Sequence, residues 1–389
     1  MANKRLNIGV IGAGGRGGLA DQAHRPAEGI HVMAGADLNP QALADFRTRY
    51  GADAFVTHDY RKLLERQEIG AVFVTSPDFL HEEHAVAALE ARKAVYLEKP
   101  MAISIEGCDR ILRTAQACKG KLYLGHNMRH SAVIVKMKEL IDAGAIGEVK
   151  VGWCRHFIAY GGDAYFKDWH ADRTKSTSLL LQKGAHDIDV LHWLCGAYTR
   201  KVTAMGGLTL YHQIQDRHAP AERGNASWSL ANWPPLSQKG LNPVLDVEDV
   251  SMMLMEMERG IFATYLQCHY TPDAWRNYTI IGSAGRVENF GDKPGHSVVR
   301  LWNKRSSYKP EGDQEFVIPE EKGGHGGADP RIVAEFISHV LEGGPARTSP
   351  VAARNSVAAG FMAAASLRQG SVPLEIPKLA DDVKAYFDA

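Results

Sequence analysis

Short apolar runs alternate with helical patterns over the first third of the chain. The runs lie at residues 6–11, 30–36, 71–74 and 94–97. Nearly continuous apolar character over such short lengths is typical of parallel strands that are buried on both faces. Helical patterns at 40–50 and 80–92 separate the runs. The alternation predicts a doubly wound parallel α/β sheet, whose ligands bind beyond the carboxyl ends of its strands.

The pattern changes at about residue 128. One helical pattern at 131–143 is followed by long segments of alternating apolar and polar residues, at 150–158, 202–211, 251–258 and 262–268. Such alternation is typical of antiparallel strands with one buried face. Because single hydrophobic cores stop growing at ~250–300 residues, the 389 residues predict two domains. We expect a parallel α/β domain at 1–127 and an α+β domain at 128–389, built on a large, mostly antiparallel sheet.

A long irregular segment lies between Tyr211 and Asp246 and contains Trp228, Trp233 and several charged residues. Loops longer than ~12–15 residues in compact domains are usually functional or disordered, and two tryptophans argue against disorder. We expect a lid or a partner-subunit contact in which Trp228 and Trp233 touch the substrate; the alternative is a structural insert.

Charge and cysteine content narrow the partners and the compartment. The 45 basic residues equal the 45 acidic residues in number, so no excess positive charge favours nucleic acid or a membrane surface. The five cysteines include no Cys-x-x-Cys pair, which indicates a reducing, cytoplasmic setting. The apolar stretch after the N-terminus is too short for a signal peptide or a membrane span.

A glycine-rich stretch follows the first apolar run. It reads Gly12-Ala13-Gly14-Gly15-Arg16-Gly17, and Asp37 ends the second run, 25 residues after Gly12. In a Rossmann domain this arrangement lets backbone N–H groups approach a pyrophosphate while the carboxylate binds a ribose diol. Asp37 therefore favours NAD over NADP, although the nearby Arg16 could weaken that preference. The alternative is a glycine-rich turn in an ordinary α/β protein.

Two further strand ends carry reactive side chains. One is Thr75-Ser76-Pro77-Asp78-Phe79-Leu80-His81, where a proline-containing loop leads into a helix, and the other is Glu98-Lys99-Pro100. Both end at the edge of the sheet where the cofactor is expected. Lys99 is thus a candidate for catalysis, and a surface lysine is the alternative.

An apolar helical pattern at 182–194 contains an unexpected histidine. If this stretch is one helix, Gln182, His186 and Asp189 share a face at i, i+4 and i+7. A lone histidine in such a helix is more often a hydrogen-bonded core residue than a catalyst. The pattern alone leaves both readings open.

Taken in order, these motifs resemble those of the Gfo/Idh/MocA family of glucose–fructose oxidoreductase, inositol dehydrogenase and related enzymes. The resemblance covers almost the whole chain and includes the Glu-Lys-Pro and Gly-x-His-x-x-Asp signatures. It rests on 12–17, Asp37, Ser76-Pro77 with His81 and His84, 98–100, 125–129, 140–149, 184–189, Val247-Glu248-Asp249 and 281–285.

The resemblance implies roles for individual residues. Lys99 would lie beside the nicotinamide and the substrate, and His186 would transfer the proton. Residues expected to line the cofactor cleft are Ser76, Pro77, His81, Glu98, Asn127 and Trp169. Many members have arginine after that tryptophan, whereas this chain has His170. The family's open sheet usually packs against that of another subunit, so a homodimer or homotetramer is expected.

Gln182 is the main departure from the family pattern. Many sugar and inositol dehydrogenases have aspartate there, four residues before the histidine, and Ser176-Thr177-Ser178 replaces a run of glycines. Glutamine can hydrogen-bond a polyol but cannot ionise. These changes indicate a different substrate pocket.

Together the motifs predict hydride transfer between NAD and a hydroxyl-bearing carbon of a sugar, polyol, cyclitol or glycoside. His186 would take the hydroxyl proton and Lys99 would stabilise the developing alkoxide, with Glu98 orienting Lys99. Alternatives are an NAD-using lyase or glycosidase that oxidises its substrate transiently, and a non-catalytic NAD-binding sensor. No metal is expected, because the metal-capable groups at His81, Glu82 and His84 and at His212, Asp216 and His218 lack structural zinc spacing.

Overall fold

The computed structural model describes residues 5–219, 227–292, 295–344 and 346–388. These residues form two compact units. The first comprises Met1–His130, Gly323–Arg354 and Lys378–Ala389, and the second comprises Ser131–Lys322 and Asn355–Pro377. The two units are described in turn below.

The first unit contains a six-stranded parallel sheet, which confirms the predicted doubly wound domain. Its strand order is β3-β2-β1-β4-β5-β6. The strands are β1 (Leu6–Ile11), β2 (Ile30–Ala36), β3 (Phe55–Thr57), β4 (Ala71–Val74), β5 (Ala94–Leu97) and β6 (Leu122–Leu124). Strands β2 and β3 lie on one side of β1, and β4, β5 and β6 lie on the other, so the strand order switches between β1 and β4. Such sheets bind ligands at the carboxyl ends of the two strands at this switch point.

Helices complete this unit, and three of those described start at a residue whose side chain caps the helix. They are α1 (Pro40–Tyr50), α2 (Tyr60–Leu64), α3 (His81–Glu90), α4 (Ile105–Cys118), α10 (Ala328–Glu342) and α12 (Asp381–Asp388). Asn39 and Ser104 cap α1 and α4 by accepting hydrogen bonds from backbone N–H groups. The segment after the glycine loop forms the 3₁₀ helix η1 (Gly15–Ala23).

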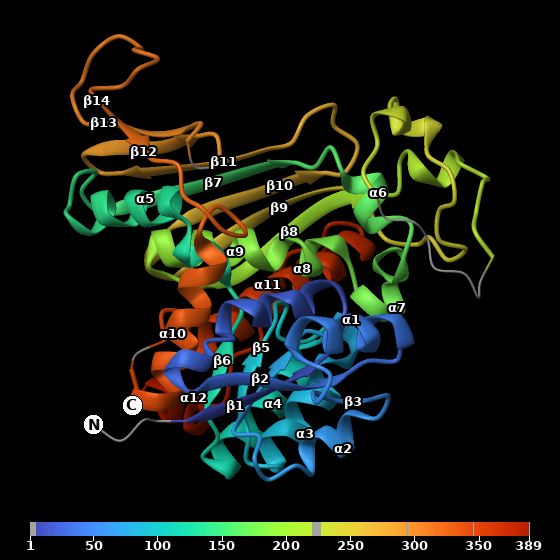
Figure 1. Ribbon diagram of the computed structural model, residues 1–389. Coiled ribbons are helices and arrows are strands. Elements are labelled where there is room, and N and C mark those ends of the chain that lie inside the picture. Colours follow the sequence, from blue (N-terminus) through green and yellow to red (C-terminus); the bar gives the residue numbers. More distant parts are fainter. Residues whose placement is uncertain (1–4, 220–226, 293–294, 345, 389) are drawn as a thin grey trace. The chain divides into compact units, whose positions relative to one another are not determined.

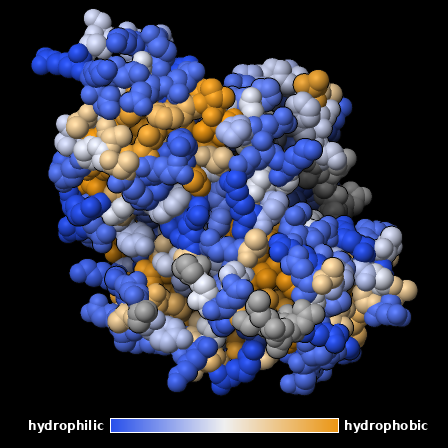
Figure 2. Space-filling model, turned by 60° about the vertical axis from the view of Figure 1, so that its left-hand side comes forward, coloured by the Kyte–Doolittle hydropathy of each residue, from blue (hydrophilic) through white to orange (hydrophobic). Residues whose placement is uncertain are grey.

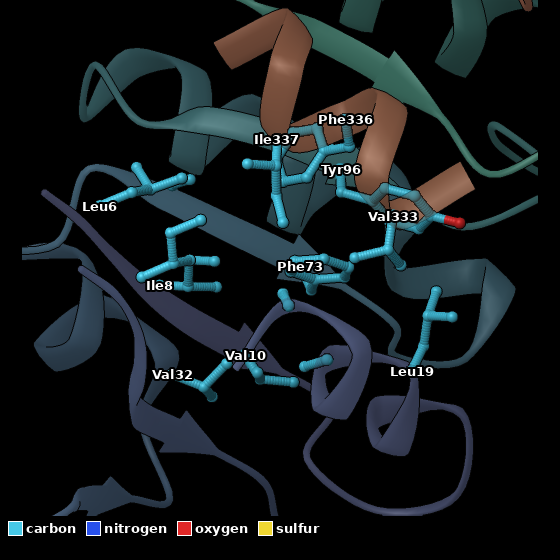
Figure 3. Close-up of a cluster of buried hydrophobic side chains, with 14 of the residues drawn as sticks. Leu6, Ile8, Val10, Leu19, Val32, Phe73, Tyr96, Val333, Phe336 and Ile337 are labelled. Atoms are coloured by element: carbon cyan, nitrogen blue, oxygen red, sulfur yellow. The ribbon is translucent and has the colours of Figure 1, made fainter. Parts of the chain in front are cut away.

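The core of the first unit includes a late segment of the chain. Phe73 of β4 stacks on Tyr96 of β5 with ring centroids 4.7 Å apart. Phe336 of α10 packs edge-on against both rings, at 5.3 and 5.5 Å, as Figure 3 shows. The predicted continuous domain at 128–389 therefore differs from the structure in its C-terminal part. The apolar face of α10 covers the parallel sheet, a long-range contact that no local pattern indicates.

The second unit contains a nine-stranded sheet of order β14-β13-β12-β11-β7-β10-β9-β8-β15. Its strands are β7 (Val149–Phe157), β8 (Thr199–Gly207), β9 (Val250–Met257), β10 (Phe262–Cys268), β11 (Trp275–Gly282), β12 (Gly285–Phe290), β13 (Ser297–Trp302), β14 (Gln314–Ile318) and β15 (Leu374–Glu375). Only β7 and β10 pair in parallel among these described strands. The mostly antiparallel sheet is as predicted.

The second unit also contains helices, of which α5 and α9 pack against the sheet. They are α5 (Ala132–Asp142), α6 (Gly161–Tyr165), α7 (Arg173–Ser176), α8 (Leu179–Gln182) and α9 (Gly184–Cys195), while α11 (Pro350–Arg368) starts in the first unit and continues into the second. Contacts join α9 to β7, β10 and β11, and α5 to β12 and β13 (Figure 1). The helix that carries His186 is thus packed against the sheet.

The opposite face of the sheet is exposed and partly apolar. Met253 and Met255 of β9 point to the helix side and are buried, whereas Met252 and Leu254 alternate with them and are exposed. Trp153 and Phe262 on neighbouring strands are also exposed. Figure 2 shows hydrophobic side chains gathered in places on an otherwise mostly hydrophilic surface. Across the described residues, no helix has both the length and the apolar character that crossing a bilayer requires.

Candidate active site

The glycine loop of the first unit is shaped by close backbone approach. Gly12 has φ +87°, and a Cβ there would lie 2.5 Å from the backbone N of Ser76. A Cβ on Gly17 would lie 2.3 Å from the carbonyl oxygen of Gly12. Side chains at these two positions would push the loop away from the end of β4. In contrast, a Cβ on Gly15 would meet open space, which leaves the outer side of the loop accessible to a ligand.

Asp37 lies beside this loop, directly after β2. Its carboxylate accepts hydrogen bonds from the backbone N–H groups of Gly14 at 3.0 Å and Asn39 at 2.8 Å. A hollow next to it is lined by Ala13, Gly14, Gly15, Asn39, Gln41, Ala42, Asp45, Phe46 and Arg49. The arrangement fits a dinucleotide, because the carboxylate can accept from a ribose diol while the loop lies against the phosphates.

Arg16 is held by two carboxylates of the same unit. Its Nε donates to Glu98 at 2.7 Å, and its two terminal nitrogens donate to Asp329 of α10 at 2.9 and 3.0 Å. Burial raises the pKa of Asp329, but hydrogen bonds from His325 and Arg16 outweigh burial and hold this pKa well below its ordinary value. The guanidinium is thus occupied by protein carboxylates, which removes the reason to expect Arg16 to weaken a preference for NAD.

Asp329 was missed by the sequence reasoning. It also accepts a hydrogen bond from the amide of Asn127 at 2.9 Å, so it links two residues that were assigned to the cofactor cleft. Arg16 and Asp329 are 313 positions apart in the sequence, so no local pattern could indicate this contact. The signal available was the glycine-rich stretch at 323–327 just before this aspartate.

His81 connects the two reactive strand ends. This buried imidazole has Nδ1 at 2.7 Å from the carbonyl oxygen of Pro100 and Nε2 at 2.8 Å from that of Ser76. Glu98 accepts a hydrogen bond from the backbone N–H of Lys99 at 2.9 Å. The structure therefore brings Ser76, His81, Glu98 and Lys99 together at the carboxyl ends of β4 and β5, while their roles remain predictions.

In the second unit, Gln182, Lys183 and His186 lie where α8 meets α9. The predicted single helix is two helical segments joined at Lys183, whose backbone is still right-handed at φ −87° and ψ −40°. The N–H of Lys183 donates to the carbonyl of Leu179 at 3.0 Å. The junction keeps a helical course, so Gln182 and His186 remain one turn apart. All three side chains are buried.

A buried polar network fixes α9 to the sheet. Asp187 accepts from His156 Nδ1 at 2.9 Å and from Tyr278, and it also lies 3.2 Å from Arg276 Nε. Burial, followed by the charge of Arg276, lowers the pKa of His156 to about 3, so this imidazole is neutral. Burial would raise the pKa of Asp187, but Arg276 and His156 lower it below its ordinary value. The network positions the helix that carries His186.

The sequence reasoning did not single out Asp187 as an anchor. The available signal was an acidic residue within an otherwise apolar helical pattern, because a carboxylate there needs partners inside the protein. Its partners come from β7 and β11, which lie far apart in the sequence, so they could not be named in advance.

The three predicted tryptophan sites differ in their surroundings. Trp169 stacks on His170, with ring centroids 3.7 Å apart, and His170 Nδ1 contacts Asp168 at 2.5 Å. Trp228 and Trp233 are 59% and 47% exposed. Residues 220–226 of the same segment lie outside the described residues. The substrate contacts assigned to Trp228 and Trp233 stay predictions.

The metal-capable side chains serve other purposes in the structure. Asp216 accepts from the N–H of Gly240 at 2.8 Å, and His218 Nε2 lies 3.0 Å from the carbonyl of Lys167. Among the residues with described positions, no three or more His, Cys, Asp or Glu side chains form a group suited to a metal ion.

Comparison with known proteins decides the family. Residues 6–126 match the family model described as the oxidoreductase family's NAD-binding Rossmann fold, and residues 138–376 match its C-terminal alpha/beta domain. The chain belongs to the Gfo/Idh/MocA oxidoreductase family. As a member, it is an NAD-binding oxidoreductase with a Rossmann domain and a second α/β domain, as the sequence motifs predicted.

Relatives within the Gfo/Idh/MocA family include sugar and polyol enzymes. YteT from Bacillus subtilis, named as an oxidoreductase, is 26% identical over 77% of this chain and 80% of its own length. The inositol 2-dehydrogenase/D-chiro-inositol 3-dehydrogenase of Halalkalibacterium halodurans is 34% identical, but over 49% of this chain and 52% of its own length. The match thus spans about half of that dehydrogenase.

Solved structures agree on the fold. A levoglucosan dehydrogenase in complex with NADH and levoglucosan has a TM-score of 0.77 at 19% identity, over 96% of this chain and 100% of its own. An oxidoreductase domain protein from Kribbella flavida has a TM-score of 0.78 at 20% identity, over the same shares. At these identities the likeness establishes the Gfo/Idh/MocA fold and leaves the substrate open.

Proposed function

We propose that this oxidoreductase transfers a hydride between NAD and a hydroxyl-bearing carbon of a sugar, polyol, cyclitol or glycoside. The observation that carries the proposal is Lys99 at the carboxyl end of β5, held with Glu98 beside the glycine loop through Arg16. A cation at that edge of a Rossmann sheet is suited to an oxygen that becomes negative during oxidation.

The residues divide the chemistry between them. Bound NAD would supply the hydride acceptor. We assign His186 as the base that takes the hydroxyl proton, because histidine is the side chain most often used for proton transfer near neutral pH. Lys99 would stabilise the alkoxide, and Gln182, one helical turn before His186, would hydrogen-bond another hydroxyl of the substrate.

The experiment is a substrate panel. Aldoses, cyclitols, sugar acids and glycosides are offered with NAD and with NADP, and the absorbance of the reduced nicotinamide is followed. Turnover of at least one group with NAD is the expected result. If a glycoside is cleaved without net release of NADH, the alternative of a lyase or glycosidase with transient oxidation replaces the dehydrogenase.

Asp37 is expected to set the preference for NAD. Asp37→Asn keeps the size and one oxygen for the N–H of Gly14 but removes the charge, so NADH binding should weaken ~10-fold or more, as for loss of a charged hydrogen bond. NADPH binding should weaken less or improve, because repulsion of the 2′-phosphate disappears. Fluorescence titration of both reduced cofactors measures the change.

Asp53→Asn is the matched control, because Asp53 is an exposed aspartate of the same unit. It should leave both affinities unchanged. A wild-type protein that prefers NADPH by more than tenfold would contradict the role given to Asp37.

We further propose that a second copy of the chain covers the exposed sheet face. Trp153, Met252, Leu254 and Phe262 lie on this face and are 44–61% exposed, and contiguous apolar patches of this kind mark interaction sites.

Leu254→Glu should shift the mass measured by light scattering toward the 42.7 kDa of one chain. Tyr308→Glu, at a residue 76% exposed away from these strands, should leave the mass unchanged. An unchanged mass for Leu254→Glu, or a monomeric wild type, would rule out this interface.

We propose that the protein is cytoplasmic, because its cysteines are unpaired. All five are free thiols, and Cys108, Cys154 and Cys195 are buried. Unpaired cysteines are the rule in reducing compartments.

A further inference from the structure

Lys183 is a buried cation with no function assigned by the mechanism above. It stands between Gln182 and Gly184, at the junction of α8 and α9, and its residue surface is 9% exposed. Within the described part of the chain, no carboxylate oxygen lies within 4 Å of its Nζ, unlike that of Lys167, the other buried lysine of this unit. Lys167 pairs with Asp163 at 3.1 Å.

The charged neighbours of Lys183 neutralise each other. The charged residues that act on its ammonium are Arg276 and Asp187, which form an ion pair at 3.2 Å. The Oδ1 atom of Asp187 that faces Arg276 also accepts from Tyr278, and its Oδ2 accepts from His156. His156 adds no charge, because it is neutral. The surroundings therefore leave the ammonium of Lys183 as one unmatched positive charge.

Two tyrosines surround this ammonium. Its Nζ lies 5.7 Å from the ring centroid of Tyr160 and 5.8 Å from that of Tyr165. Cation–π contacts at this range offset part of the cost of removing the charge from water. Despite burial, the phenol groups of Tyr160 and Tyr165 help to hold the pKa of Lys183 above its ordinary value, but a neutral phenol adds no net negative charge. Because no carboxylate offsets the charge of the ammonium, the site is suited to an anion from outside the chain.

His269 gives a second indication of a missing ligand. Its ring packs edge-on against Tyr165, with centroids 5.3 Å apart. The residue is fully buried, and neither ring nitrogen has a hydrogen-bond partner among the described residues. Buried polar atoms are nearly always hydrogen-bonded in native proteins. Tyr165 thus has an unmatched cation and an unsatisfied imidazole packed around it.

We propose that Lys183 binds a carboxylate of the substrate, so that the substrate is a sugar acid. This inference rests on the proposed function, in which Gln182 and His186 contact the substrate. Lys183 follows Gln182 directly and lies at the same junction of α8 and α9. One unmatched positive charge suits the single charge of a carboxylate better than a phosphate, which carries ~1.5–2 negative charges at neutral pH.

Binding is tested on the full-length protein loaded with NADH, by calorimetric titration with matched pairs of ligands. The pairs are D-glucuronate with D-glucose and D-galacturonate with D-galactose, and D-glucose 6-phosphate is added as the other anion. We expect one uronate to bind at least tenfold more tightly than its neutral partner. Lys183→Met should remove this preference, since a hydrogen bond to a charged group contributes ~10- to 100-fold. Lys183→Arg should keep most of it.

Equal binding of acid and neutral sugars, a preference that survives in Lys183→Met, or tighter binding of the phosphate would overturn the proposal. Following NAD reduction with the same ligands separates the two claims. Uronates that bind through Lys183 without being oxidised would refute the dehydrogenase function alone. Neutral sugars oxidised as readily as their acids would refute the carboxylate site alone.

Thermal unfolding without ligand tests whether Lys183 has a structural role. Lys183→Met removes a buried cation that has no carboxylate partner and leaves no carboxylate uncompensated, so it should lower the melting temperature much less than the control does. Lys167→Met is the control, because it leaves Asp163 buried without its ion-pair partner and should lower the melting temperature. If both variants lower it equally, Lys183 serves the fold and the proposal is wrong.

Discussion

Replacing Lys99 or His186 with alanine is expected to lower turnover on the true substrate by ~10²- to 10⁴-fold, the usual contribution of a general acid–base group. Without Lys99, no ammonium at the end of β5 would stabilise the developing alkoxide. Without His186, the hydroxyl proton would have to leave to water. Steady-state rates of NAD reduction, measured at saturating NAD, give the size of each loss.

Two exposed residues of the same types serve as controls. Lys62→Ala on α2 and His212→Ala should change turnover by less than twofold, because both side chains lie on the surface. Equilibrium binding of NADH should stay near that of the wild type in His186→Ala. Turnover within about threefold of wild type in both active-site variants would show that the assignment of the catalytic pair is wrong.

Asp187→Ala is expected to reduce the free energy of unfolding of the second unit by ~3–5 kcal/mol, the usual effect of removing one partner from a buried ion pair. The variant leaves the guanidinium of Arg276 buried without its carboxylate and removes the acceptor of Tyr278. Urea denaturation followed by tryptophan fluorescence measures the change. Glu256→Ala, which removes an exposed partner of Lys201, should shift the curve little.

Acid should weaken the same network. The folded protein holds the pKa of Asp187 below its ordinary value, so its contribution is present above the unfolded pKa of ~3.9 and is lost as pH falls through the folded value. In Asp187→Ala this part of the acid dependence should be missing. A variant with wild-type stability at neutral pH would show that Arg276 finds another partner.

The local parts of the candidate site could be predicted from the sequence. The glycines, Asp37 and the Glu98-Lys99 pair each follow a strand within a few residues, and a parallel sheet gathers the carboxyl ends of its strands at one edge. Their clustering therefore needed only the correct fold class. His81 was named for the cleft, but its bridge between the Ser76 and Pro100 carbonyls depends on side-chain packing that the pattern does not contain.

The distant parts could not be predicted. Asp329 meets Arg16 across 313 residues, and Arg276 meets Asp187 only because β11 pairs with β7 beneath α9. Lys183 was visible in the sequence as a lysine in an apolar segment, but its unmatched charge emerges only when its neighbours are known. Pairings between distant elements decide these contacts, and local periodicity carries no information about them.

The late position of α10 has a consequence for how the protein is made. Phe336 belongs to the core of the cofactor-binding unit, and Asp329 holds the arginine of its glycine loop. During synthesis the first 130 residues emerge from the ribosome before α10. At that stage Phe336 does not yet cover Phe73 and Tyr96, and Arg16 does not yet have Asp329 as an ion-pair partner. The nucleotide-binding unit is completed only when nearly the whole chain has been translated, so a gene fragment that ends near residue 130 encodes an unfinished domain.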